Sequence, residues 1–143
     1  MSHPSLVPEL YCTDIGLGVA FYNEVLGFSV LYERPEHHFA YLQLGPTELM
    51  LEQPINGERT WLTGPLEKPF GRGKNLATFM DDIDPLLTRL CKTGRPLFLP
   101  VEERWYRRDD QEVGNRQFVV QDPDGYLLRF CTDLGSRVDH APA

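Results

Sequence analysis

Two stretches of the sequence follow the same order: LVPELYCTDIGLGVAFYNEVLGFSVLYE at residues 6–33 and KNLATFMDDIDPLLTRLCKTGRPLFLPV at residues 74–101. Each runs as an apolar strand, an Asp-Ile pair, a helix, a glycine and a second strand. A repeat of this length indicates one supersecondary unit used twice. The stretches therefore predict an α+β domain made of two copies of the same small unit.

The helices in these stretches have recognisable ends. Asp14 and Asp82 can accept hydrogen bonds from the first free N–H groups of a helix, and Pro85 is tolerated in a first turn. Gly27 and Gly94 suit a left-handed C-terminal cap. Residues spaced three and four apart give each helix an apolar face: Val19, Tyr22 and Leu26 in the first, and Leu86, Leu87, Leu90 and Cys91 in the second.

Three strand-like segments follow each helix, so each unit is predicted to be βαβββ. The first copy has residues 28–33, 39–44 and 48–53, with a Gly-Pro turn before the last. The second has residues 96–100, 116–121 and 126–131, with the turn Asp-Pro-Asp-Gly at 122–125. We expect one domain over residues 1–143: module one at 5–53, an irregular connector at 54–73, module two at 74–133 and a frayed tail at 134–143. Residues 102–115 are expected to form a long loop.

Composition narrows the class of protein. A chain of 143 residues with 41% hydrophobic and 24% charged residues suits one globular domain. It has no apolar run long enough to span a bilayer and no signal-peptide pattern, so a cytoplasmic protein is expected. A net charge of −7 argues against nucleic acid as a partner and favours a cationic ligand, although solubility alone also explains it. Cys12, Cys91 and Cys131 form no CxxC pair and are expected to be small buried residues.

Two segments resemble a known family: VPELYCTDIGLGVAFYNEVLGF, from Val7 to Phe28, and DPDGYLLRF near the end of the chain. They are similar to the vicinal-oxygen-chelate superfamily, which contains glyoxalase I, extradiol dioxygenases, and fosfomycin- and bleomycin-resistance proteins. The resemblance covers about residues 5–133. It implies two βαβββ modules that form a cupped mixed sheet, and a homodimer that often pairs modules across chains.

The resemblance also implies positions for a divalent metal on the first and last strands of each module. Here those positions hold Val7, Glu52, Asn75 and Arg129. Only Glu52 is a good ligand, and the permanent cation of Arg129 would repel a metal. The four histidines, His3, His37, His38 and His140, are expected at the surface. We therefore expect no metal and no cofactor, and we hypothesise that Glu52 and Arg129 form an ion pair instead.

Without a metal, the chain looks closest to the bleomycin-resistance branch, whose members sequester a flat cationic drug without chemistry. The sequence GNRQFVVQDP at 114–123 is similar to a stretch of that branch. The predicted function is therefore binding of a small, partly aromatic molecule, as in antibiotic resistance, with bleomycin as one candidate ligand. The candidate groove residues are Phe39, Tyr41, Met50, Glu52, Trp61, Trp105, Tyr106 and Arg129.

Two alternatives remain open. The chain could be an enzyme of the same superfamily, either metal-dependent or a metal-free isomerase, with Glu52 as ligand or general base. It could also be a structural or regulatory module that binds no small molecule. For the aromatic residues, Phe39 and Tyr41 could belong to the core or a dimer interface, and Trp105 could cover a groove or pack its own loop.

Overall fold

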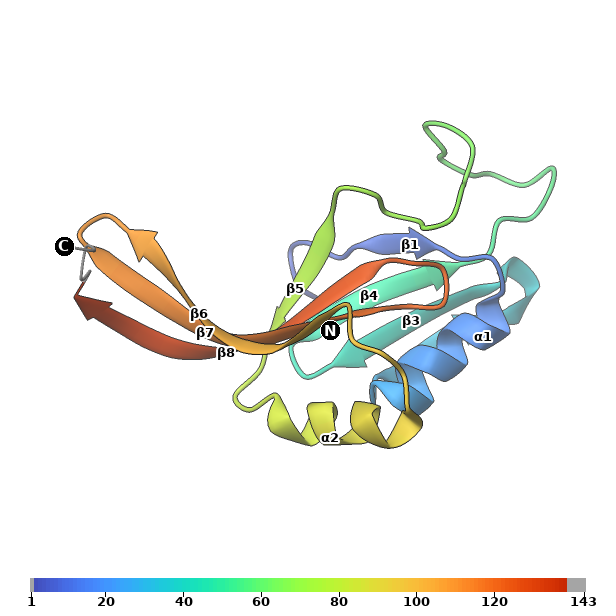
Figure 1. Ribbon diagram of the computed structural model, residues 1–143. Helices are drawn as coiled ribbons and strands as arrows, with labels where there is room; N and C mark the ends of the chain where they lie inside the picture. Colours follow the sequence, from blue (N-terminus) through green and yellow to red (C-terminus); the bar gives the residue numbers. More distant parts are fainter. Residues whose placement is uncertain (1, 139–143) are drawn as a thin grey trace. The chain divides into compact units, whose positions relative to one another are not determined.

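A computed structural model describes residues 2–138, which form two compact units (Figure 1). The first unit takes the chain up to Arg72 together with Asp122–Tyr126, and the second takes Gly73–Gln121 and the chain from Leu127 on. Each unit holds a four-stranded mixed sheet and little helix. The prediction of an α+β fold with two βαβββ modules is confirmed.

The first unit contains the elements β1 to β4 and α1. In chain order they are β1 (Glu9–Tyr11), α1 (Ile15–Ala20) continuing as a π-helical turn (Phe21–Val25), β2 (Ser29–Arg34), a 3₁₀ turn (Pro35–His37), β3 (Phe39–Leu44) and β4 (Thr47–Glu52). The strand order is β1-β4-β3-β2. Strand β1 is parallel to β4, and the other pairs are antiparallel.

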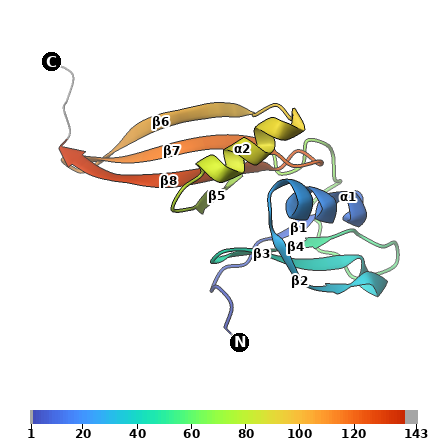
Figure 2. The same ribbon diagram turned by 90° about the horizontal axis from the view of Figure 1, so that it is seen from below.

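The second unit repeats this arrangement with longer strands (Figure 2). Its elements are β5 (Asn75–Phe79), α2 (Asp84–Thr93), β6 (Leu99–Arg108), β7 (Gln111–Gln121) and β8 (Leu127–Val138). The strand order β5-β8-β7-β6 matches that of the first unit, with β5 parallel to β8. The two sheets therefore have the same topology, as the sequence repeat predicts.

The helix ends behave largely as predicted. Asp14 accepts a hydrogen bond from the Leu17 amide at 3.1 Å, which caps α1. Asp82 accepts one from the amide of Asp84, the first residue of α2. Helix α2 ends at Gly94, whose φ of +70° is the left-handed conformation expected there.

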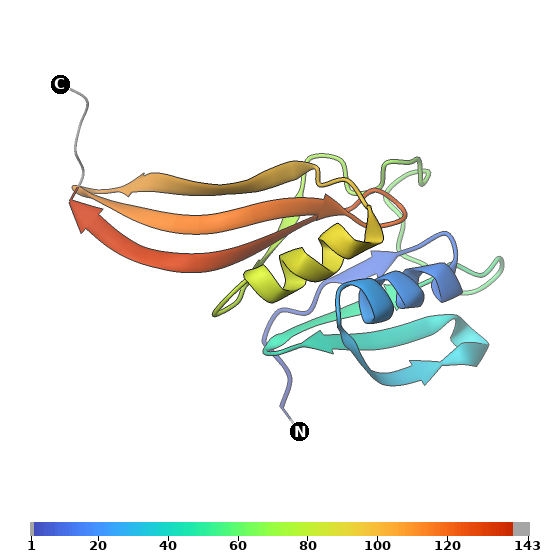
Figure 3. The ribbon, with the colours of Figure 1, turned by 60° about the horizontal axis from the view of Figure 1, so that its bottom comes forward.

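Each helix covers one face of the sheet in its own unit (Figure 3). In the first unit, Gly18 of α1 lies against Leu51 and Cys12, so the helix packs on the face that carries these residues. Successive side chains in a strand point to opposite faces. The opposite face of this sheet, which carries Glu9 and Glu52, is therefore free of helix within the unit.

The structure departs from the sequence expectation at three places. Residues 102–115, expected as a loop, belong to the antiparallel strands β6 and β7 and the turn between them. Residues 134–138, expected in the tail, extend β8, because they pair with the start of β7. Cys91 is exposed, whereas Cys12 and Cys131 are buried as predicted.

Two further expectations concern the C-terminal tail and membrane-spanning segments. His140 and the last part of the expected tail lie outside the described residues. No helix among residues 2–138 is long and apolar enough to cross a membrane.

Candidate functional site

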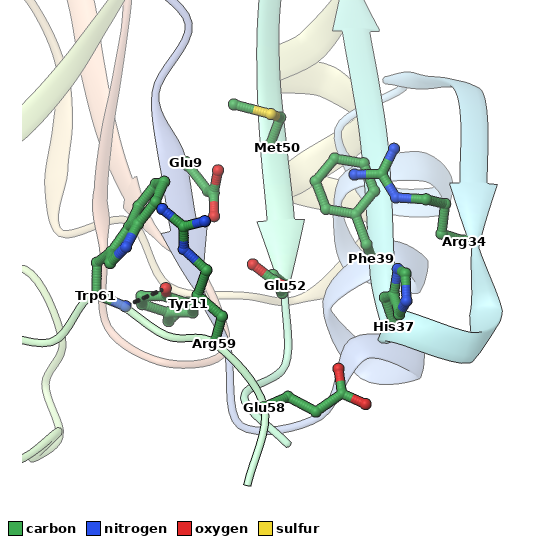
Figure 4. Close-up of a pocket in the computed structure, with 10 residues that line it drawn as sticks. All are labelled: Glu9, Tyr11, Arg34, His37, Phe39, Met50, Glu52, Glu58, Arg59 and Trp61. Carbon is green, nitrogen blue, oxygen red and sulfur yellow. Dashed lines mark hydrogen bonds between the residues drawn. The ribbon is translucent and has the colours of Figure 1, made fainter. Parts of the chain in front are cut away.

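A pocket of about 390 Å³ lies in the first unit, on the sheet face that α1 does not cover (Figure 4). Strands β1, β3 and β4 supply one part of its lining, and the end of β2, the 3₁₀ turn and the connector supply the rest. The lining residues are Glu9, Tyr11, Arg34, His37, Phe39, Met50, Glu52, Glu58, Arg59 and Trp61.

Two carboxyl groups meet in this pocket. Because β1 runs parallel to β4 with Tyr11 opposite Glu52, the side chains of Glu9 and Glu52 share a face. Both carboxyl groups line the pocket. Burial and the neighbouring Glu52 carboxyl group raise the pKa of Glu9, while the Arg34 guanidinium opposes the rise. Glu9 therefore keeps its proton to a higher pH than an isolated glutamate does.

Aromatic rings flank these carboxyl groups. Phe39 lies under the guanidinium of Arg34, whose central carbon is 3.9 Å from the ring centroid. Trp61 is 69% exposed, and Arg59 lies 4.7 Å from its ring centroid. The Trp61 backbone amide donates a hydrogen bond of 2.9 Å to the Tyr11 hydroxyl. This bond ties the connector to β1 and places the indole beside the pocket (Figure 4).

Tyr41 lies next to the pocket residues on β3 but does not line the pocket. Its hydroxyl donates a 2.6 Å hydrogen bond to Glu48, and its ring stacks on Tyr32 with centroids 5.1 Å apart. The hydrogen bond to Glu48, with burial, raises the pKa of Tyr41 to about 12. Tyr41 therefore stays protonated at neutral pH and acts as a donor to Glu48.

Four of the residues predicted from sequence come together in the pocket: Phe39, Met50, Glu52 and Trp61. The other predicted residues, Trp105, Tyr106 and Arg129, belong to the second unit. The hypothesis that Glu52 pairs with Arg129 stays a prediction, because it joins residues of different units.

The second-unit residues have partners of their own. An added Cβ at Gly114 would lie 2.7 Å from the indole of Trp105, so the ring covers this glycine. Arg137 stacks on the same ring at 4.0 Å from its centroid. The buried Gln117 amide donates to the Tyr106 hydroxyl at 2.7 Å, and Arg129 donates to Gln117 at 3.4 Å. Trp105 thus packs on its own hairpin.

Sequence reasoning missed six lining residues: Glu9, Tyr11, Arg34, His37, Glu58 and Arg59. Strand alternation was the usable signal for two of them, since Glu9 and Tyr11 fall on one face of β1. Arg34 lies opposite Phe39 in the pairing of β2 with β3, which no local pattern specifies.

The donor groups at the implied metal positions do not fit a divalent metal. Val7 has no donor atom, Arg129 is a cation, and Asn75 is a weak neutral ligand. That leaves Glu52, a single carboxylate, as the one good ligand of the four positions. Within residues 2–138, no group of three or more His, Cys, Asp or Glu side chains is arranged to hold an ion.

The whole of the two-module region matches one family. Residues 4–130 fit the model of the Glyoxalase/Bleomycin resistance protein/Dioxygenase superfamily. The chain belongs to this superfamily. Its membership confirms the resemblance seen in the two sequence segments, but members of one fold can carry different functions, so the function has to be argued from the site.

Two solved structures, the first two of the three below, share the fold of this chain. TioX from Micromonospora sp. ML1 is 24% identical, with a TM-score of 0.70, and the match covers 94% of this chain and 100% of that one. A lactoylglutathione lyase from Agrobacterium tumefaciens is 21% identical, with a TM-score of 0.59 over 90% and 94% of the two chains. A superfamily member from Vibrio splendidus 12B01 is 40% identical over 90% and 97%, with a TM-score of 0.42. No curated protein matches the sequence significantly.

Proposed function

We propose that this protein binds a small, partly aromatic molecule without chemistry, in the pocket on the first sheet. The observation that carries the proposal is the arrangement of Phe39 and Trp61 around the Glu9–Glu52 carboxyl pair. Binding sites for small molecules typically combine apolar or aromatic walls with a few polar groups that fix orientation. Such a protein would sequester its ligand in the cytoplasm, as antibiotic-resistance proteins do.

The walls suit a flat ring. The Trp61 indole is largely exposed, its backbone amide is anchored to Tyr11, and Arg59 lies over its ring. An exposed indole on an anchored backbone provides a surface on which a ligand ring can stack. The Met50 thioether adds a polarisable contact on the neighbouring strand.

The charges suit a ligand with a basic group and a carbonyl or acidic group. A ligand amine or amidine can replace the proton on Glu9 and donate hydrogen bonds to both carboxylates. Arg34 and Arg59 make no ion pair with any carboxylate among the described residues. Their guanidinium groups remain able to donate to a carbonyl or carboxylate on the ligand.

Tryptophan fluorescence tests this proposal because the chain has two tryptophans, of which Trp61 lines the pocket. The purified protein is titrated with bleomycin and with acriflavine, a flat aromatic cation. We expect quenching that saturates, that disappears in Trp61→Phe and that persists in Trp105→Phe. Quenching lost only in Trp105→Phe would place the ligand elsewhere. A stoichiometric metal in the purified protein, measured by elemental analysis, would contradict the proposal.

A second candidate function is a metal-free enzyme of the same superfamily, such as an isomerase. It is favoured by the Glu9–Glu52 pair, since a carboxylate beside a carboxylic acid is suited to removing and returning a proton. In this case Glu52 is the general base. Turnover of a carbonyl substrate that is lost in Glu52→Gln but kept in Glu67→Gln, which lies outside the pocket, would favour the enzyme over the binder.

A further inference from the structure

Strand β6 is one of the two edge strands of the second sheet. The strand order puts it at the end of the sheet with β7 as its neighbour, and Figure 2 shows it along the outer border of the unit. Its pairing with β7 is regular from Glu102 to Arg108, while a bulge lies between Leu99 and Glu102. An edge strand of this kind presents unpaired backbone N–H and C=O groups that another strand can bind.

The charges along this regular stretch are arranged asymmetrically. The sequence Glu-Glu-Arg-Trp-Tyr-Arg-Arg, residues 102–108, starts with two acids and ends with two bases. When two copies of this stretch pair antiparallel, the acidic residues of one strand lie opposite the basic residues of the other.

Glu103 and Arg107 each face an oppositely charged residue of β7 within the described part of the chain, but neither forms an ion pair with it. Across the ladder, Glu103 faces Arg116, but the salt bridge of Arg116 goes to Asp84 at 3.1 Å. Arg107 similarly faces Glu112, which pairs with Arg137 at 3.2 Å. The Arg107 guanidinium donates only a long hydrogen bond of 3.4 Å to a backbone carbonyl. Glu103 and Arg107 are both exposed, so their charges are available to another molecule.

We infer that the β6 strands of two copies of this protein pair antiparallel about a two-fold axis at Trp105. In this register each Glu102 lies opposite Arg108 of the other copy, and each Glu103 opposite Arg107. The symmetry gives four oppositely charged cross-strand pairs and two Arg104–Tyr106 pairs, with the two Trp105 backbones opposite each other at the axis.

The charge pattern selects this register over its neighbours. Moving the axis to Arg104 would place that arginine against itself. Moving it to Tyr106 would place Arg104 against Arg108 and Glu103 against Asp109. A parallel pairing in register would align like charges at every charged position, which is unfavourable.

The Trp105 side chain leaves the edge open. Its ring lies over Gly114 on β7 and under Arg137 from β8, so the side chain leans across its own sheet and away from the edge. The pairing would extend two four-stranded sheets into one sheet of eight strands. This association differs from the exchange of modules between chains that the family resemblance implies.

Charge reversal and charge exchange on β6 test the inference. The oligomeric state of the full chain is measured by sedimentation equilibrium in low salt and in high salt. We expect a dimer that weakens as salt is added. Glu103→Arg or Arg107→Glu alone turns two attractive pairs into repulsive ones, and we expect the dimer dissociation constant to rise roughly tenfold or more. The double variant E103R/R107E exchanges the charges and should restore association.

A matched control separates this surface from general charge effects. Glu67→Arg makes the same charge change on an exposed connector residue and should leave the dissociation constant unchanged. Circular dichroism checks that each variant is folded, so a loss of association cannot come from unfolding. A wild-type monomer, a dimer that E103R leaves intact, or a double variant that fails to associate would each overturn the inference.

Discussion

The carboxyl groups of Glu9 and Glu52, on adjoining strands of the first sheet, line one pocket, and Glu52 helps to raise the pKa of Glu9. The parallel pairing of β1 with β4 brings them to one face, inside the pocket that aromatic residues flank. Because its pKa is raised, Glu9 keeps a proton to a higher pH than an isolated glutamate does. Ligand binding and proton binding are therefore linked at this site.

The first prediction concerns pH. A cationic ligand competes with the proton on Glu9, so the affinity of wild-type protein for acriflavine should rise as pH increases through the raised pKa of Glu9. The Glu9→Gln variant should bind more weakly at neutral pH and lose most of this dependence. Fluorescence titrations between about pH 4 and pH 8 measure both effects. Glu67→Gln, outside the pocket, should behave like wild type, and a wild-type affinity that does not vary with pH would contradict the linkage.

The contribution of Glu9 to the stability of the folded protein should fall as pH rises, whereas the affinity for a cationic ligand should increase. Because the pKa of Glu9 is raised in the folded state, the folded protein holds this proton more tightly than the unfolded chain does. The contribution of Glu9 to stability is therefore present at low pH and is lost as pH rises through the folded-state pKa. Glu9→Gln should be at least as stable as wild type at neutral pH in urea unfolding.

The second prediction concerns Arg34, which stacks on Phe39. Its positive charge lowers the pKa of Glu9, whereas burial and Glu52 raise it. Arg34→Met keeps the length of the side chain but removes its charge, so the pKa of Glu9 should rise further. Carbon-13 NMR of the glutamate carboxyl groups measures the titration midpoint directly. Arg59→Met is a suitable comparison, because Arg59 also lines the pocket and stacks on an aromatic ring, Trp61. The same rise in both variants would show that Arg34 has no specific role.

The sequence was sufficient for the repeated unit and for part of the pocket. Asp14 and Gly94 signal helix ends through local chemistry, and the structure uses both in that way. Phe39, Met50 and Glu52 could be grouped because strand residues two apart share a face. These inferences need only the backbone geometry of single elements or of adjacent strands.

Features that depend on long-range contacts could not be predicted. Residues 102–115 carry so many charges that they resemble a loop, yet they form strands because β7 pairs on both sides. Arg59 and Trp61 lie in an irregular connector, and their place in the pocket depends on one hydrogen bond to Tyr11. No periodic pattern in the connector indicates that bond.

The third prediction concerns the buried hydrogen bond between Tyr22 and Asp122. The Tyr22 hydroxyl donates to the Asp122 carboxylate at 2.9 Å, and both side chains are buried. Tyr22→Phe leaves the carboxylate with one donor fewer, which should destabilise the protein by about 1–3 kcal/mol in urea unfolding. Tyr32→Phe removes a hydroxyl from a half-exposed ring and should have little effect.

The pH dependence of this variant is a further check. Burial raises the pKa of Asp122, and the bond from Tyr22 counteracts that rise. Removing the hydroxyl should raise the pKa further, so the destabilisation should be larger at neutral pH than in acid, where Asp122 is protonated. A loss of stability that is equal at both pH values would mean that lost packing, rather than the hydrogen bond, causes it.

The fourth prediction concerns Gly125, in the turn between β7 and β8. Its φ is +106°, and an added Cβ would lie 2.5 Å from the Cβ of Pro69 and 2.7 Å from its Cα. The turn and the connector are also joined by a 2.8 Å hydrogen bond from the Phe70 amide to the Asp124 carbonyl, so neither segment can move freely. Gly125→Ala should therefore combine backbone strain with a clash and cost about 3 kcal/mol or more in urea unfolding.

Two other glycines separate these two effects. Gly45 has a φ of +58° but open space around its Cα, so Gly45→Ala reports the cost of backbone conformation alone. Gly64 has open space and no positive φ, so Gly64→Ala should be close to neutral. We expect the loss of stability to increase in the order Gly64, Gly45, Gly125. Both Gly45 and Gly125 have a positive φ, but only Gly125 has a close neighbour, Pro69. If Gly125→Ala costs no more stability than Gly45→Ala, the contact with Pro69 adds nothing, and the turn at residues 122–125 does not pack tightly against the connector.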